Sequence, residues 1–162
     1  MQCAFRQWPV AAYTLAGGLV LAATYVGRGR MNLRTDAAAV TGGVLLLLAA
    51  ALLAWSYASL GRAVSLWVQP EAERLVVTGP YRFVRHPAYL GMLVAFIGIA
   101  LAARSWLGLL SVFVFMGPGT WLRAANEERM LRQRFGETWV EYASRTGSIL
   151  PGVGKVARGT GT

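Results

Sequence analysis

Four apolar runs, separated by polar segments, occupy most of the chain up to Leu122. The first extends from Trp8 to Val26 and the second from Ala37 to Leu60. Because about 20 apolar residues cross the hydrocarbon core of a bilayer, each predicts a membrane-spanning helix, and the short arginine-containing connector predicts a hairpin. A signal peptide is the alternative for the first run, but its apolar region would be shorter and would end at a small-residue cleavage site.

The third and fourth runs, Ala88 to Ala103 and Trp106 to Leu122, are shorter. Sixteen residues of helix are about 24 Å long, less than the roughly 30 Å of the hydrocarbon core. The two runs therefore predict a hairpin that tilts or barely crosses. The sequence Gly117-Pro118-Gly119 predicts an interruption of the fourth helix, because proline removes a backbone hydrogen bond. Such a break is tolerated best beside a protein-lined cavity.

Three polar segments complete the pattern. Residues 61–87 predict a loop on the membrane surface, Arg123 to Arg145 predicts a polar helix, and Gly147 to Thr162 predicts a loosely ordered, glycine-rich tail. The predicted fold is therefore all-α. It is a multi-pass integral membrane protein with about four transmembrane or hairpin helices and a cytoplasmic C-terminal helix.

Composition and charge support this location and set its orientation. Hydrophobic residues make up 56% of the sequence and charged residues 14%, whereas soluble domains carry about a quarter charged residues. The net charge of +9 comes from arginine, apart from Lys155. In the four-span arrangement 12 of 16 basic residues lie on the side of the polar segments, so the positive-inside rule places these segments in the cytoplasm. No basic stretch is interleaved with aromatic residues, which argues against nucleic-acid binding.

The cysteine and histidine content limits the available chemistry. Cys3 is the only cysteine, which excludes an intrachain disulfide, and His86 is the only histidine. A metal site built from protein ligands is therefore not expected.

Polar residues gather in two clusters at the ends of the predicted second hairpin. The first extends from Gly79 to Gly91, and the second from Arg123 to Glu128. Because a hairpin brings its ends together, we expect the clusters to be neighbours in space. Adjacent Glu127 and Glu128 repel each other, and a cationic ligand would relieve that cost. The alternatives are that the arginines contact lipid headgroups, and that Arg123 and Glu127 form a surface ion pair worth a few tenths of a kcal/mol.

Together the clusters form a specific motif, although neither half is specific alone. The chain resembles the isoprenylcysteine carboxyl methyltransferase family, and the related membrane phospholipid N-methyltransferases, between Leu75 and Pro151. The matching residues are Gly79-Pro80-Tyr81, Arg85-His86-Pro87-Ala88-Tyr89-Leu90-Gly91, Glu127-Glu128, Phe135-Gly136, Tyr142 and Leu150-Pro151.

The resemblance implies a methyltransferase that uses S-adenosylmethionine and acts on a lipid-like small molecule among membrane lipids. It implies catalytic roles for Arg123 and Glu127, and contact of Arg85 and Arg123 with the substrate. Trp139 stands where many relatives have tyrosine. The resemblance also implies the cofactor-binding residues, which are Tyr81, His86, Pro87, Tyr89, Gly91, Glu127 and Glu128.

The methyl acceptor is predicted from the chemistry of the transfer. A carboxylate is already ionised near neutrality, whereas a protonated amine must first lose a proton. With one histidine in the chain, carboxyl O-methylation of an isoprenoid- or lipid-tailed substrate is favoured. Phospholipid N-methylation, or a non-catalytic protein with the same fold, is the alternative. The expected organisation is a two-helix hairpin (1–60), a methyltransferase core (61–151) and a flexible tail (152–162).

Overall fold

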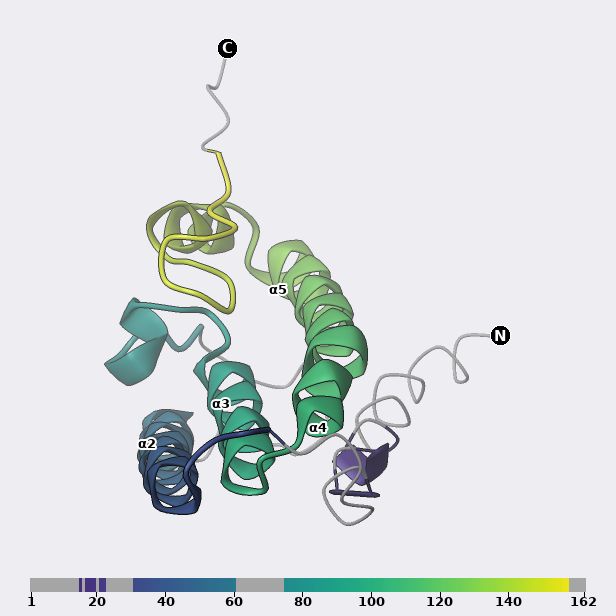
Figure 1. Cartoon of the computed structure of the whole chain (residues 1–162). Coiled ribbons are helices and arrows are strands. Elements are labelled where there is room, and N and C mark those ends of the chain that lie inside the picture. Colours follow the sequence, from purple (N-terminus) through teal and green to yellow (C-terminus); the bar gives the residue numbers. More distant parts are fainter. Residues whose placement is uncertain (1–14, 16, 20, 23–30, 61–74, 158–162) are drawn as a thin grey trace. The chain divides into compact units, whose positions relative to one another are not determined.

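The computed structural model describes residues 15, 17–19, 21–22, 31–60 and 75–157 (Figure 1). Most of the first predicted span, Trp8 to Val26, and the first part of the polar loop therefore lie outside the described residues. Within them the chain is helical, which confirms the all-α prediction there, and its one β-bridge pairs Val84 with Gly147. The elements are α2 (Thr35–Leu60), the 3₁₀ turn η2 (Gly79–Arg82), α3 (Pro87–Ala102), α4 (Trp106–Ser111), the π-helical turn η3 (Val112–Met116) and α5 (Gly117–Arg145).

The chain forms two compact units that divide α2, α3 and α5 between them. The apolar unit comprises Met1–Ala51 and Gly91–Arg123, and the polar unit comprises Leu52–Leu90 and Ala124–Thr162. This division runs across the helices, and the predicted organisation into residues 1–60, 61–151 and 152–162 stays a prediction.

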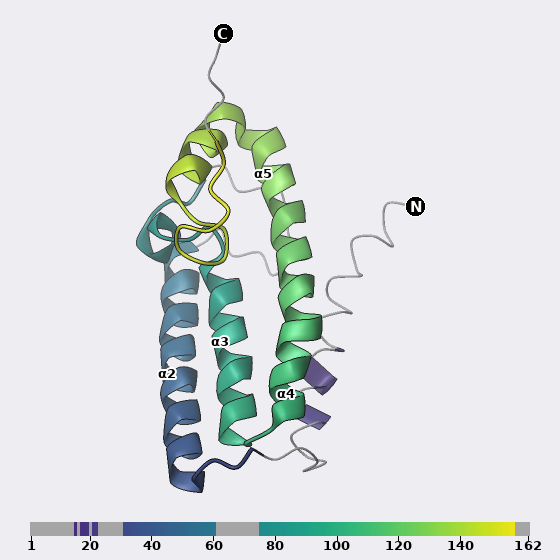
Figure 2. The same ribbon diagram turned by 45° about the horizontal axis from the view of Figure 1, so that its top comes forward.

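In the apolar unit, α2 and α3 pack closely because small residues face each other. A Cβ atom on Gly42 would lie 2.6 Å from the Ala102 Cβ and 2.6 Å from the Gly98 carbonyl oxygen, too close for an unshifted backbone. Such small-residue contacts let helices approach in a membrane, where lipid is as apolar as leucine. Figure 2 shows the two helices running alongside each other in this unit.

The other face of α3 packs against the turn η3 in the same unit. Buried Val112 and Met116 form its core, together with Met92, Leu93, Phe96 and Ile97 of α3. The turn has π-helical bonding, since the Gly117 N–H donates to the Val112 carbonyl. This wider turn accommodates Pro118, whose ring would clash with the preceding turn of an α-helix. The interruption predicted at Gly117-Pro118-Gly119 is therefore wrong in position and form, because these residues are helical and the irregularity is the π-helical turn directly before them.

Two described helical stretches, Thr35–Leu60 and Trp106–Arg145, are long and apolar enough to cross a membrane. The 16-residue α3 is shorter. The apolar part of the second stretch ends at Leu122, and its charged part begins at Arg123. The predicted count of four spans, with the polar segments in the cytoplasm, stays a prediction.

The predicted polar helix Arg123 to Arg145 is the continuation of α5, and it bends at Gly136. This residue has φ 53° and ψ −126°, a conformation open essentially only to glycine. The glycine therefore sets the direction of the last helical turns, which carry Trp139, Tyr142 and Ala143 into the polar unit.

A second glycine fixes the polar loop before α3. Gly79 has φ 61°, and a Cβ atom there would overlap the Ser59 hydroxyl at the end of α2. The turn that carries Tyr81 and leads to Arg85 can thus lie close to the helix only because residue 79 has no side chain.

Candidate active site

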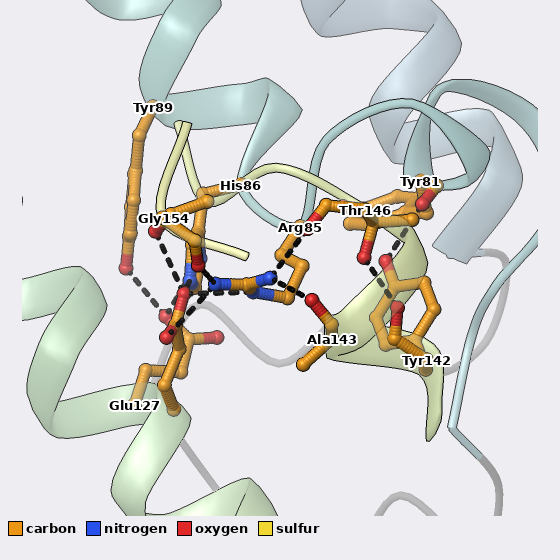
Figure 3. A network of polar contacts seen from close by, with 11 residues as sticks. Tyr81, Arg85, His86, Tyr89, Glu127, Tyr142, Ala143, Thr146 and Gly154 are labelled. Carbon is orange, nitrogen blue, oxygen red and sulfur yellow. Dashed lines mark hydrogen bonds and ion pairs between the residues drawn. The ribbon is translucent and has the colours of Figure 1, made fainter. Parts of the chain in front are cut away.

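The two predicted clusters meet within the polar unit, which confirms their expected proximity (Figure 3). Arg85 and His86 precede α3, whose first turn begins with the bond from the Leu90 N–H to the His86 carbonyl. Pro87 occupies the first helical position, where its missing N–H costs nothing. Glu128 of α5 lies 2.9 Å from the Arg85 Nε.

Glu128 is held by three side chains. Its Oε1 accepts hydrogen bonds from the Arg85 Nε at 2.9 Å and the Ser148 Oγ at 2.7 Å, and lies 3.2 Å from the His86 Nε2. Its Oε2 accepts from the Arg85 Nη2 at 3.2 Å. A carboxylate offers about four lone-pair sites, and of the four contacts to Glu128 three are made to Oε1 and one to Oε2.

These contacts make the Glu128 carboxyl group more acidic than that of an ordinary glutamic acid. Burial alone raises the pKa of Glu128, but the hydrogen bonds from His86, Arg85 and Ser148, with the charge of Arg85, outweigh burial and lower the pKa to about 2. The Glu128 carboxylate is therefore ionised throughout the physiological pH range.

Arg85 uses all of its donors inside the protein. Besides Glu128, its guanidinium donates to the carbonyl oxygens of Ala143 at 3.0 Å, Thr146 at 2.6 Å and Gly154 at 2.7 Å. A guanidinium has five N–H groups, and the five bonds to these four residues engage each of them. The side chain is 2% exposed. This geometry does not support the predicted contact of Arg85 with a substrate.

Glu127 has a different environment from that of its neighbour. Its Oε2 accepts a hydrogen bond from the Tyr89 hydroxyl at 2.8 Å and lies 3.8 Å from the His86 Nδ1. Its Oε1 accepts no hydrogen bond from the part of the chain that the structure describes, and the side chain is 30% exposed. A partly exposed carboxylate oxygen can accept hydrogen bonds from an ammonium group or from sugar hydroxyls.

His86 and Tyr89 form a stacked pair beside these carboxylates. Their ring centroids are 5.2 Å apart and the rings are inclined by 11°. His86 thus touches both glutamates and Tyr89, while Tyr89 directs its hydroxyl to Glu127, as Figure 3 shows.

The C-terminal segment forms one wall of this network. The Arg85 N–H donates to the Gly147 carbonyl at 2.8 Å, and the His86 N–H donates to the Ser148 carbonyl at 3.1 Å. A Cβ atom on Gly147 would overlap the Leu150 carbonyl, so the tight turn requires glycine. The prediction of a loosely ordered tail from Gly147 is therefore wrong for residues 147–157, which have a defined conformation.

Two further aromatic residues support the wall. The Tyr142 hydroxyl donates to the Tyr81 carbonyl at 2.7 Å. Burial, and then the nearby charge of Glu127, raise the pKa of Tyr81, so its phenol is neutral. The Arg85 guanidinium lies 5.7 Å from the centre of the Trp139 ring, and Trp139 is buried with its Nε1 unpaired among the described residues.

The remaining predicted residues, Gly91 and Arg123, belong to the apolar unit. Gly91 is buried in α3, and Arg123 is half-buried in α5, one turn before Glu127. Ser148 and the carbonyl groups that Arg85 binds were not predicted from the sequence. Within the matching motif, Tyr142 and Leu150-Pro151 lie in this part of the chain.

The chain belongs to the phospholipid methyltransferase family, whose model matches residues 37–138. It is 33% identical over 81 residues to protein-S-isoprenylcysteine O-methyltransferase B of Arabidopsis thaliana, a match that covers 50% of this chain and 41% of the relative. Over 74 residues it is 34% identical to methanethiol S-methyltransferase 1 of Bradyrhizobium diazoefficiens, which covers 44% of this chain and 24% of the relative.

A solved structure shares the fold. The eukaryotic intramembrane Ras methyltransferase, isoprenylcysteine carboxyl methyltransferase, matches with a TM-score of 0.63 and 20% identity. The match covers 91% of this chain and 53% of that one, so the chain spans about half the length of this protein and less than half of the two relatives above. The family match and the two apolar helices among the described residues indicate an integral membrane protein of the phospholipid methyltransferase family.

Proposed function

We propose that the chain transfers a methyl group from S-adenosylmethionine to the carboxylate of an isoprenoid- or lipid-tailed substrate at the cytoplasmic face of a membrane. The observation that carries this proposal is the unequal environment of the two glutamates. Arg85 balances the charge of Glu128, whereas the Glu127 side chain is partly exposed beside the stacked rings of His86 and Tyr89.

The residues of this site fit a sulfonium donor. Such a donor carries a cationic sulfur, an ammonium group and ribose hydroxyls. The Glu127 Oε1, which accepts no hydrogen bond from the described residues, can accept one from the ammonium group or from the hydroxyls. The Tyr89 hydroxyl fixes the orientation of Glu127. S-adenosylmethionine would supply an activated methyl group, which forms a bond to the acceptor oxygen while the electron pair of the carbon–sulfur bond stays on sulfur, giving S-adenosylhomocysteine.

The protein contributes alignment and exclusion of water, because this displacement needs no general base when the acceptor is a carboxylate. We propose that Arg123 holds the acceptor carboxylate through two parallel hydrogen bonds, a geometry that a guanidinium provides and an ammonium group does not. Its position at the end of the apolar part of α5 suits a substrate whose tail lies in lipid and whose carboxylate lies at the surface.

Phospholipid N-methylation is the second candidate, and the description of the matching family model favours it. An amine acceptor is protonated near neutrality and must lose a proton before attack. The transferred methyl group itself distinguishes the two reactions, since a methyl ester is cleaved by base and an N-methyl group is not.

The test is to incubate the purified protein with methyl-labelled S-adenosylmethionine and a membrane lipid extract that contains prenylated carboxylates. We expect label in a lipid-soluble product that base releases, and loss of transfer in Glu127→Gln. Glu137→Gln is the matched control, because Glu137 is an exposed carboxylate on the same helix. Label that stays on a phospholipid after treatment with base would show N-methylation and overturn the proposed O-methylation. Absence of transfer to any lipid would refute the proposal as a whole.

A further inference from the structure

We infer that the two adjacent glutamates have different functions, and that Glu128 with Arg85 is a positioning pair that fastens the C-terminal segment Thr146–Gly154 against His86. In this arrangement Glu127 alone of the two contacts the methyl donor, a part of the inference that rests on the proposed function. The fastening of the segment does not depend on any ligand.

The first argument is the capacity of the Glu128 carboxylate. Both of its oxygens accept bonds from the buried Arg85 guanidinium, and Oε1 also receives the Ser148 hydroxyl. Its side chain is 16% exposed, about half of the 30% of Glu127. A ligand would compete with four internal contacts at Glu128, and with two at Glu127 among the described residues.

The second argument is where the Arg85 guanidinium leads. Three of its five bonds end on backbone carbonyls, at Ala143, Thr146 and Gly154. Those carbonyls belong to the last turn of α5 and to the segment that follows it. The Arg85 guanidinium is buried and fully bonded. Because Arg85 directly precedes His86 in the chain, these bonds hold the segment next to His86.

Third, the fastened segment contacts His86 directly through its backbone and indirectly through Glu128. Ser148 accepts the His86 N–H at its carbonyl and donates its hydroxyl to Glu128, which in turn touches the His86 ring. Tyr89 stacks on the His86 ring and donates its hydroxyl to Glu127, so it links the position of His86 to that of Glu127. Glu128 therefore acts on the site through His86 and Tyr89, as a positioning residue.

Hydrogen exchange measures the fastening directly. Backbone amides in and next to the segment are protected by bonds whose donors are Thr146, Gly147, Ser148, Val153 and Val156. In the detergent-purified full chain, without ligand, Glu128→Gln should speed exchange of peptides covering residues 146–156 about tenfold, the effect of weakening charge-assisted bonds. Glu127→Gln should leave this exchange unchanged.

A second pair of variants tests the role of the hydroxyl group. Ser148→Ala removes the hydroxyl that binds Glu128 and should also speed exchange, while Ser148→Thr keeps a hydroxyl and should restore protection. Calorimetry with S-adenosylhomocysteine completes the comparison. Glu127→Gln should lower the affinity about tenfold or more, and more than Glu128→Gln does.

Each outcome decides a part of the inference. The positioning role of Glu128 would be overturned if the Glu128→Gln variant exchanged its amide hydrogens at the rate of the unchanged protein. It would also be overturned if the Glu127→Gln variant exchanged them as fast as the Glu128→Gln variant. A greater loss of affinity in Glu128→Gln than in Glu127→Gln would overturn the division of functions. If the parent binds no S-adenosylhomocysteine, the contact of Glu127 with the donor and the proposed function both fail, while the exchange data still judge the fastening of the segment.

Discussion

The contacts inside the apolar unit differ in kind from the contacts inside the polar unit. In the apolar unit, helices meet through small residues such as Gly42 and Gly98 and through the core pair Val112 and Met116. In the polar unit the contacts converge on Arg85, whose five bonds reach residues as far apart in sequence as Glu128 and Gly154.

This difference predicts how each unit responds to change. Packing of small residues tolerates substitution wherever there is space and fails where there is none. A hydrogen-bonded network around a buried charge fails when the charge is removed, because its partner is left buried and uncompensated. The apolar unit is thus sensitive to volume, and the polar unit is sensitive to charge and hydrogen-bonding geometry.

The largest effect is expected at the centre of the polar unit. Arg85→Leu leaves Glu128 and three carbonyl groups without their donor, and should lower the free energy of unfolding by about 3–5 kcal/mol. Arg145→Leu is the control, because Arg145 is 66% exposed and pairs with Glu141 one turn away. That pair is worth about 0.3–0.5 kcal/mol. Unfolding in mixed detergent micelles measures both, and similar losses would contradict the contrast.

A steric test probes the apolar unit. Gly42→Ala places a methyl group 2.6 Å from Ala102, and should cost about 1–3 kcal/mol of unfolding free energy. Gly43→Ala meets nothing within 4 Å, and should be neutral or stabilise α2 by about 0.5–1 kcal/mol. If the two variants unfold alike, close approach of α2 and α3 is not what holds this unit together.

Arg123, the last residue of the apolar unit, tests the proposed contact with the acceptor. Arg123→Lys keeps the charge but loses the paired hydrogen bonds, so we expect about a tenfold lower kcat/KM with little change in affinity for S-adenosylhomocysteine. If Arg123 instead only shapes the donor site through Glu127, the Lys variant will be mild. In that case Arg123→Ala will weaken donor affinity as much as Glu127→Gln does.

The smallest effect concerns pH. The pKa of Glu128 is lowered from 4.5 to about 2, so its contribution to stability is present above pH 4.5 and is lost as the pH falls from about 4.5 to about 2. The difference in Tm between the parent and Glu128→Gln should therefore be constant from pH 7 to about 5 and should shrink below that. A difference that disappears near pH 6 would contradict the assignment of the shift to Glu128.

Hydropathy was sufficient to predict the described apolar helices. The runs Ala37 to Leu60 and Ala88 to Ala103 agree within two residues with α2 (Thr35–Leu60) and α3 (Pro87–Ala102). The continuity across Pro118 was not predicted, because a π-helical turn has no hydropathy signature. The length of an apolar run can be read from the sequence and is enough to predict such a helix. The pattern of backbone hydrogen bonds around a proline cannot be read from it.

The motif predicted the meeting of Arg85, His86 and Tyr89 with Glu127 and Glu128, because a hairpin joins its ends. The motif did not predict that all the hydrogen-bond donors of the Arg85 guanidinium bind partners within the protein. Those partners are mostly backbone carbonyls, which every residue carries and which leave no pattern in a sequence. The place of the C-terminal segment likewise depends on Gly136 and Gly147, whose conformations only the folded chain reveals.

The central claim is that the partly exposed Glu127 carboxylate of the polar unit binds the methyl donor. Calorimetric titration of the detergent-purified protein with S-adenosylhomocysteine tests it most directly, with Glu127→Gln and the exposed control Glu137→Gln measured beside the parent. The account predicts saturable binding to the parent and to Glu137→Gln, and a loss of about 1–3 kcal/mol of binding free energy in Glu127→Gln. Equal affinity in all three proteins, or no binding to the parent, would contradict it.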